Sequence, residues 1–275
     1  MSNPQLNLGT VVSLWRYPVK SMMGEELNAA DVTERGLVGD RAYALIDPTS
    51  GKVASAKNPR KWAKLFDFRA AYIGPPRGGT NIPPLLITLP DGNIVTTQQS
   101  DLNQILSKVL EREVTLGTTP PETPSLEEYW PDTGGLDHRE TITDESMLPS
   151  TFFDGAVIHV LTTATIDRLR ELYPQGRFEV RRFRPNIVVE SSTGEKGFVE
   201  NDWIGHTLGI GADVQLNIIR ACPRCVMTTL PQGDLPKDSG ILRTAAQYNQ
   251  VNVGVYAAVL RGGTLHRGDP VRLQQ

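Results

Sequence analysis

Short apolar runs, each ended by glycine or proline, recur along the whole chain and limit the folds that it can adopt. The 275 residues contain 25 glycines and 20 prolines. Apolar runs interrupted so often are typical of strands joined by turns, and they argue against a helix bundle. The clearest strand pair is PLLITLPDGNIVTT (residues 84–97), where Asp91-Gly92 separates two β-rich arms and predicts a hairpin. We therefore expect a mostly β protein with helices, an α+β fold.

Three helices interrupt the expected strands. The best-defined one has Ser100 as its N-cap and apolar residues at helical spacing over residues 102–110. Shorter helices are expected over residues 165–173 and 241–248. No Gly-x-Gly-x-x-Gly turn joins a strand to a helix, which disfavours a dinucleotide-binding sheet. Beyond the hairpin, a first strand is expected from residue 11 until Pro18 ends it, before a basic turn at Lys20-Ser21. The other expected strands cover residues 26–34, 42–47, 157–163, 183–190, 202–211, 214–221, 253–260 and 269–273.

Overall charge and cysteine content exclude several classes of protein. A net charge of −3 argues against binding to nucleic acid or to an anionic membrane, so any anion site must be a local basic cluster. The first residues, MSNPQLNLG, lack the basic and apolar parts of a signal peptide, and no apolar run is long enough for a membrane helix. The two cysteines are too few for the disulfide framework of a secreted protein. We expect a cytoplasmic protein.

An acidic, proline-rich segment interrupts this rhythm over residues 116–150. Eight acidic residues lie between Glu122 and Glu145, and Arg139 is the only Lys or Arg among them. A stretch of this length without secondary structure is usually a linker or a functional loop. Two interpretations stay open, a solvated linker near a domain boundary and a docking surface for a basic partner.

The motif CPRC, with Cys222 and Cys225, is the sharpest chemical feature. A zinc site is disfavoured because no second cysteine pair is present, and an iron–sulfur cluster needs more thiolates. A thioredoxin-like dithiol needs a helix after the motif, but VMTTLPQGD is β-rich and then broken. Two alternatives remain: a single thiolate that binds a soft or high-valent metal, favoured by the adjacent Arg224, or two inert buried cysteines.

Two basic groups are candidates for anion binding. Four arginines fall within residues 177–184, and strand alternation would place Arg182, Arg184 and Asn186 on one face. A guanidinium binds phosphate through two parallel hydrogen bonds, although a solvated strand face is the alternative. The second group comprises Lys20-Ser21 and Arg41, which lie beside turns. The strand period would place Arg41 with Tyr43 and Leu45 on one face.

Four motifs, in this order, make the chain resemble MOSC proteins, whose members include mitochondrial amidoxime-reducing components and bacterial MOSC oxidoreductases. The resemblance covers nearly the whole chain. It implies an N-terminal β-barrel domain over residues 9–120, packed on a MOSC β-barrel domain over residues 125–275. The motifs are YPVKSM (17–22), GLVGDRAY (36–43), RFRPNIVV (182–189) and ACPRCVMTT (221–229).

The resemblance also implies a cofactor, molybdopterin with molybdenum, bound between the two domains. Cys225 would be the metal ligand and the catalytic residue. Members of the family are also associated with pyridoxal phosphate binding, which we attach to the fold and to no residue of this chain. The residues that would hold the pterin and its phosphate are Lys20, Ser21, Arg41, Thr162, Thr163, Arg184 and Asn186.

The activity that the resemblance implies is reduction of N-hydroxylated compounds such as amidoximes and hydroxylamines. Because two cysteines cannot build an electron relay, a separate ferredoxin-, flavodoxin- or cytochrome-type protein is expected to donate electrons. We expect no N-terminal membrane anchor of the kind that the mitochondrial relatives carry, and LPQGDLPKD (230–238) replaces their VDPDTG. Two other functions stay open: a cofactor or sulfur carrier with a persulfide on Cys225, and a dithiol–disulfide oxidoreductase using both cysteines.

Overall fold

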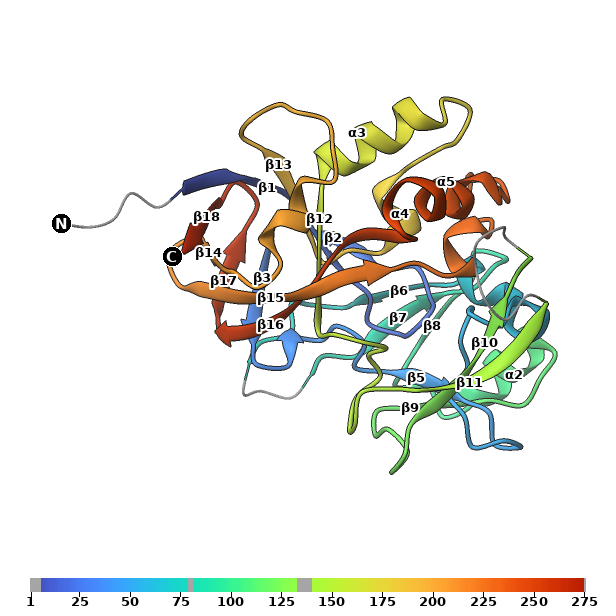
Figure 1. The fold of residues 1–275 in the computed structure, drawn as a ribbon. Coiled ribbons are helices and arrows are strands. Elements are labelled where there is room, and N and C mark those ends of the chain that lie inside the picture. The colour runs from blue at the N-terminus through green and yellow to red at the C-terminus, as the bar shows by residue number, and fades with distance from the viewer. Residues whose placement is uncertain (1–5, 79–81, 133–139, 275) are drawn as a thin grey trace.

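The computed structural model, which describes residues 6–78, 82–132 and 140–274, contains a closed barrel of seven strands (Figure 1). The barrel closes because β1 (Leu6–Arg16) pairs with both β13 (Ile187–Ser191) and β18 (Pro270–Gln274). The mostly β fold with helices is thereby confirmed. From β13 to β18 the intervening strands are, in order, β12 (Ile158–Thr162), β16 (Asn252–Arg261), β15 (Val214–Pro223) and β14 (Thr207–Ile210).

Alternating apolar side chains fill the barrel, as the strand period requires. Val11 and Leu14 of β1 meet Val160, Ile187 and Val255 in one cluster, and none of these side chains is more than 1% exposed. The N-terminal strand therefore contributes to a core built mostly by the C-terminal part of the chain. A short strand, β2 (Glu25–Leu27), pairs with the last residues of β1, Leu14 to Arg16.

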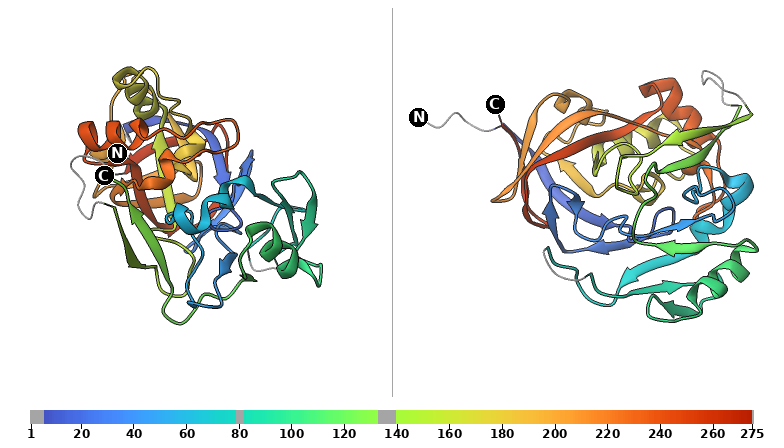
Figure 2. Two further views of the ribbon diagram at one scale, coloured as in Figure 1. Left: turned by 90° about the vertical axis from the view of Figure 1, so that its right-hand side faces the viewer. Right: turned by 90° about the horizontal axis from the view of Figure 1, so that it is seen from below.

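Small sheets and helices form a second core in the N-terminal region (residues 17–117), which lies beside the barrel (Figure 2). The predicted hairpin is confirmed, since β7 (Leu85–Thr88) and β8 (Ile94–Thr96) pair across it. Val226 and Leu230, which follow CPRC, also pack into this core. The other elements of the region are β3 (Ala29–Thr33), β4 (Gly36–Leu37), β5 (Ala44–Ile46), α1 (Pro59–Trp62), η1 (Ala63–Asp67), β6 (Arg69–Tyr72), α2 (Leu102–Leu110) and β9 (Thr115–Gly117).

All three predicted helices are present. α3 (Thr163–Leu172) and α5 (Gly240–Asn249) pack together over one side of the barrel (Figure 1). In α2 the N-cap is Asp101 rather than Ser100, one residue later than expected. No helix among the described residues is long and apolar enough to cross a membrane. Near the C-terminus, β17 (Gly263–His266) pairs with β3.

Two expected strands are partly helical. Residues 180–183 form the helical turn α4 (Val180–Phe183), so β13 begins only at Ile187. The 3-10 helix η2 (Val199–Trp203) likewise takes up the start of the strand expected over 202–211. Arg41 lies in a turn with φ of 47°, before β5 begins, so it does not share a strand face with Tyr43.

The acidic segment is neither a linker nor structureless. β10 (Ser125–Trp130) and β11 (Thr141–Ser146) pair along their whole length as an antiparallel ribbon. Apolar burial at Leu126 and Met147 attaches the ribbon to β5 and to Phe152. The two strands were missed because charged residues fall on both faces of each strand and interrupt any apolar alternation. Residues 133–139, which include Arg139, lie outside the described residues.

Candidate functional site

A cavity of about 410 Å³ lies where the barrel meets the N-terminal region and the β10–β11 ribbon. Five of the eight residues predicted from sequence line it. They come from four separate parts of the chain, which the fold brings together. These residues are Lys20, Arg41, Arg184, Asn186 and Cys225.

Left-handed backbone conformations mark three of the predicted residues. Ser21, Arg41 and Arg184 have φ angles of 64°, 47° and 53°. Such a conformation costs a non-glycine residue about 1 kcal/mol or more, and it persists where the surrounding structure requires it, typically at functional sites. For Arg184 the reason is local, since this residue ends α4 and turns the chain into β13.

Two guanidinium groups converge on the ring of Tyr17. The Cζ atoms of Arg41 and Arg184 lie 4.6 Å and 4.1 Å from its centroid. Nη1 of Arg184 donates to the Met22 carbonyl at 2.7 Å, which leaves Nε and Nη2 without hydrogen-bond partners among the described residues. Burial, with the nearby charge of Arg41, lowers the pKa of Arg184 to about 10. An anion in the cavity would relieve this unfavourable burial of like charges.

Asn186 lines the cavity but its amide is already used within the protein. Its Nδ2 donates to Asp40 at 2.9 Å and to the Trp15 carbonyl at 3.3 Å, and its Oδ1 accepts from the His159 backbone at 3.1 Å. Asp40 in turn holds Arg41 through a short hydrogen bond. Asn186 therefore positions Asp40 and Arg41, rather than offering a free amide to a ligand.

Lysines and carboxylates alternate along another wall of the cavity. Lys20 donates from Nζ to Asp154 at 2.8 Å and to the Phe152 carbonyl at 2.9 Å, and burial lowers its pKa. Lys57, which the sequence did not single out, lies 2.8 Å from Glu128 and 4.0 Å from Asp154. Although burial acts to lower the pKa of Lys57, the negative groups around it raise that pKa well above the ordinary value. The only sequence signal was a lysine before Asn-Pro in a turn.

The two cysteines occupy different environments. Cys225 lines the cavity, half-buried, where β15 passes into the 3-10 helix η3 (Val226–Thr229), while Cys222 is fully buried. Arg224 contacts Cys222 directly, with 2.7 Å between its Nη1 and the sulfur, and its charge also acts to lower the pKa of Cys225. Burial and the charge of Glu128 raise the pKa of Cys225 to about 11. Burial acts in the same direction on Cys222, but Arg224 and His159 outweigh it and lower that pKa to about 6.

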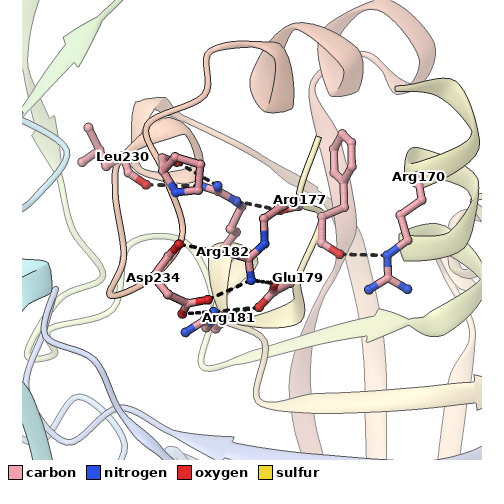
Figure 3. Close-up of polar contacts among 9 residues, drawn as sticks. Arg170, Arg177, Glu179, Arg181, Arg182, Leu230 and Asp234 are labelled. Atoms are coloured by element: carbon pink, nitrogen blue, oxygen red, sulfur yellow. Dashed lines mark hydrogen bonds and ion pairs between the residues drawn. The ribbon is translucent and has the colours of Figure 1, made fainter. Parts of the chain in front are cut away.

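Arg182 does not share a face with Arg184, because residues in a helical turn rotate by about 100° rather than alternate. Its buried guanidinium instead donates to the carbonyls of Thr228 (3.2 Å), Leu230 (3.2 Å) and Pro236 (2.9 Å). Figure 3 shows Arg182 beside Leu230. On the surface, Asp234 pairs with Arg177 and Arg181 (Figure 3). The arginine-rich motif therefore holds the segment that follows Cys225.

The other three predicted residues do not line the cavity. Ser21 is buried behind it, where its Oγ accepts from the Ala56 backbone at 3.1 Å. Thr162 is the N-cap of α3, accepting from the Thr165 backbone at 3.1 Å and donating to Glu200 at 2.6 Å. Thr163 is the first residue of that helix. A direct contact of these residues with a ligand has no support in this arrangement.

The cavity combines anion-binding cations with one accessible thiol. No group of three or more His, Cys, Asp or Glu side chains in the described part of the chain could hold a metal ion. A metal in this cavity would therefore take Cys225 as its protein ligand and its remaining ligands from a bound molecule. Arg41 and Arg184 would suit the phosphate of such a molecule.

Several known proteins are similar to this chain over most of its length. Rat mitochondrial amidoxime reducing component 2 is 25% identical, with 96% of this chain and 83% of the relative covered. Mouse mitochondrial amidoxime-reducing component 1 is also 25% identical, with 97% of this chain and 82% of the relative covered. The YuaD protein from Bacillus subtilis, a solved structure, aligns over 98% of this chain and all of its own, with 11% identity and a TM-score of 0.46. Residues 8–73 match the MOSC N-terminal beta barrel domain and residues 148–272 the MOSC domain, so the chain belongs to the MOSC family.

Proposed function

We propose that this protein is a molybdenum-cofactor-dependent oxidoreductase that reduces N-hydroxylated compounds, such as amidoximes and hydroxylamines. The observation that carries the proposal is the meeting of Cys225 with Lys20, Arg41 and Arg184 in one cavity. A thiolate suits a soft or high-valent metal, and paired guanidinium groups suit a phosphate. The relatives named for amidoxime reduction agree with this reaction class.

The residues present fit molybdopterin at the phosphate end. Arg184 keeps Nε and Nη2 without hydrogen-bond partners among the described residues, which is the two-pronged edge that binds phosphate. Arg41 and Lys20 would add charge, and Asn186 would hold Arg41 in place through Asp40. When bound, the cofactor would supply the two-electron chemistry of molybdenum.

The protein would contribute binding, orientation and proton control. Cys225 would hold the metal, since it is the cysteine that lines the cavity. Its raised pKa means that metal binding must release the thiol proton, and the charges of Lys57 and Arg224 act in favour of the thiolate. Electrons would come from a separate donor protein, and the oxygen of the substrate would leave as water.

Metal content and turnover test the proposal together. Protein produced in a host supplied with molybdate should hold close to one molybdenum per chain and should reduce benzamidoxime with reduced methyl viologen. A sulfur carrier would instead show persulfide on Cys225 without metal. A dithiol enzyme would show a reversible Cys222–Cys225 disulfide, which the full burial of Cys222 disfavours. Protein that holds no molybdenum and does not reduce benzamidoxime would contradict the proposal.

A further inference from the structure

Arg220 lines the cavity but stands apart from the basic residues at its phosphate end. The residue is exposed, so it lies where the cavity opens to solvent. Its Nη2 donates to the Gly155 carbonyl at 3.2 Å, and its guanidinium forms no ion pair with a carboxylate of the described residues. Because Nη2 carries a second hydrogen, one two-pronged edge of the guanidinium is left for a ligand.

A β-bulge in β15 turns Arg220 toward the cavity. Ile218 lies opposite Ala257 and Arg220 lies opposite Tyr256, so Ile219 is an extra residue without a partner of its own in β16. With regular alternation Arg220 would point into the barrel core, as the fully buried Ile218 does. Bulges of this kind re-aim side chains and are frequent beside active sites.

Two neighbours hold the guanidinium of Arg220 in place. Its Cζ lies 4.8 Å from the ring centroid of Tyr256, which also lines the cavity. On the other side, a Cβ atom at Gly155 would lie only 2.3 Å from Nη2 of Arg220, so a glycine is needed there to leave room. A side chain that is already held loses less conformational entropy when it binds a ligand.

The charge of the cavity favours an anion beyond the cofactor phosphate. Six Lys and Arg side chains line it against three Asp and Glu side chains, an excess of three positive charges in a protein with a net charge of −3. Among the three carboxylates, Glu128 and Asp154 each pair with a lysine at 2.8 Å. The third, Glu145, accepts from Thr143 at 2.7 Å. The positive charge of Arg220 is therefore not balanced within the cavity.

We propose that Arg220 is a specificity-determining residue, which binds a carboxylate of the substrate at the mouth of the cavity. A carboxylate matches the open edge of the guanidinium through two parallel hydrogen bonds. This inference rests on the proposed function and names, within it, N-hydroxylated substrates that also carry a carboxylate. In the reaction the N–O bond breaks, two electrons come from the donor protein, two protons come from solvent and oxygen leaves as water. The carboxylate is unchanged, so substrate and product are held alike.

The distance along the chain allows one substrate to reach both ends of such a site. Cys225 follows Arg220 by five residues, at most about 17 Å of extended backbone. Both residues line the same cavity, and the arginine side chain shortens the span further. The N–OH group can then lie near Cys225 while the carboxylate lies at Arg220.

Benzamidoxime and its 4-carboxy derivative test the proposal on the holoenzyme, since they differ in the carboxylate alone. Calorimetry without reductant measures binding, and turnover with reduced methyl viologen measures kcat and KM. Arg220→Gln should weaken binding of the carboxylated compound and raise its KM about tenfold, with kcat unchanged, and should leave benzamidoxime unaffected. Arg261→Gln is the matched control, because Arg261 lies on β16 outside the cavity and pairs with Asp213. It should alter neither compound.

Gly155→Ala separates the position of the guanidinium from its charge. The added methyl group displaces Nη2 of Arg220 but leaves the net charge of the protein unchanged. This variant should therefore also bind the carboxylated compound more weakly, with benzamidoxime again unaffected. If Gly155→Ala binds both compounds as the wild type does, the held position of Arg220 has no part in recognition.

Other results would overturn the assignment or the proposed function. Equal affinity of Arg220→Gln and wild type for the carboxylated compound, in a protein that reduces benzamidoxime, would contradict this inference alone. Equal losses for both compounds would indicate a change of cavity shape. A loss seen only when a protein donor replaces methyl viologen would assign Arg220 to donor docking instead. Binding of the carboxylated compound that depends on Arg220, in a protein that reduces neither compound, would contradict the proposed function alone.

Discussion

Arg224 lies against Cys222, with 2.7 Å between its Nη1 and the sulfur, although it is the direct neighbour of Cys225 in the chain. Its Nη2 donates to the Phe183 carbonyl at 2.8 Å. Arg224 thus joins the end of β15 to the turn that carries Arg184. Within the CPRC motif, Cys222 and Arg224 therefore hold the end of β15 in place, and Cys225 faces the cavity.

The first prediction concerns the two cysteines. Cys225→Ser should lose molybdenum and activity, because serine is a harder and much less acidic ligand. Cys222→Ser should keep most of its metal but lose about 1–3 kcal/mol of unfolding free energy, since Arg224 would face a neutral hydroxyl in a buried position. Metal analysis and urea unfolding measure the two effects. The reverse pattern would show that Cys222 is the ligand.

The second prediction is a pH dependence that belongs to Cys222. Its pKa is lowered from 9.0 to about 6 in the folded protein, mainly by Arg224 acting against burial. A lowered folded-state pKa stabilises the protein fully above pH 9, and this stabilisation is lost as the pH falls through 6. In the metal-free Cys225→Ser protein, thiolate absorbance near 240 nm should rise with a midpoint near pH 6. A midpoint near 9 would contradict the ion pair.

The fold class and most strands could be predicted from sequence because their periodicity and turn residues are local. The hairpin at Asp91-Gly92 and the helix over 102–110 are examples. The pairing of β1 with β13 and β18 could not be predicted, since it joins segments more than 170 residues apart. The acidic ribbon was missed for a different reason: its strands are held by pairing and by a few buried residues, not by an alternating apolar face.

Only those residues of the candidate site that belong to a sequence motif could be predicted. Lys20, Arg41, Arg184 and Cys225 do meet in the cavity. Lys57 and Glu145 were missed because a lysine in a turn and a glutamate in an acidic stretch resemble solvated surface. Arg182 was wrongly predicted to share a face with Arg184, because residues 180–183 form a helical turn and not a strand. Sequence spacing cannot distinguish a residue that contacts a ligand from one, such as Asn186, that orients its neighbours.

The third prediction concerns the phosphate end of the cavity. Arg184→Lys keeps the positive charge but loses the planar fork, so the protein should retain less molybdenum after gel filtration. Arg181→Lys is the control, because Arg181 lies on the adjacent surface and pairs with Asp234. Metal content per chain is the measurement. If both lysine variants retain as much metal as the wild type, Arg184 does not bind the cofactor phosphate.

The fourth prediction is that turnover requires a separate electron donor. Two cysteines cannot hold an iron–sulfur cluster, and the described residues contain no other metal-binding group. Purified protein should therefore reduce benzamidoxime with reduced methyl viologen but not with NADH or NADPH alone. Adding a ferredoxin-, flavodoxin- or cytochrome-type protein with its reductase should restore activity. Turnover with a nicotinamide and no added protein would require a flavin and would contradict this prediction.

The last prediction concerns Arg182, a buried residue that positions the segment after Cys225. Its guanidinium binds the carbonyls of Thr228, Leu230 and Pro236, so Arg182→Met should leave three acceptors without a donor and cost about 3 kcal/mol or more. Arg182→Lys can restore only some of these bonds and should fold with an intermediate stability.

A purely structural role would lower stability alone, whereas a positioning role also changes Cys225. In metal-free Arg182→Lys, held well below its melting temperature, Cys225 should react faster with a thiol reagent than in the wild type, because η3 no longer fixes it. Asp234→Ala is the control: it removes only the surface pairs with Arg177 and Arg181 (Figure 3), so thiol reactivity should stay at the wild-type value. Equal reactivity in all three proteins would mean that Arg182 stabilises the fold without controlling the cysteine.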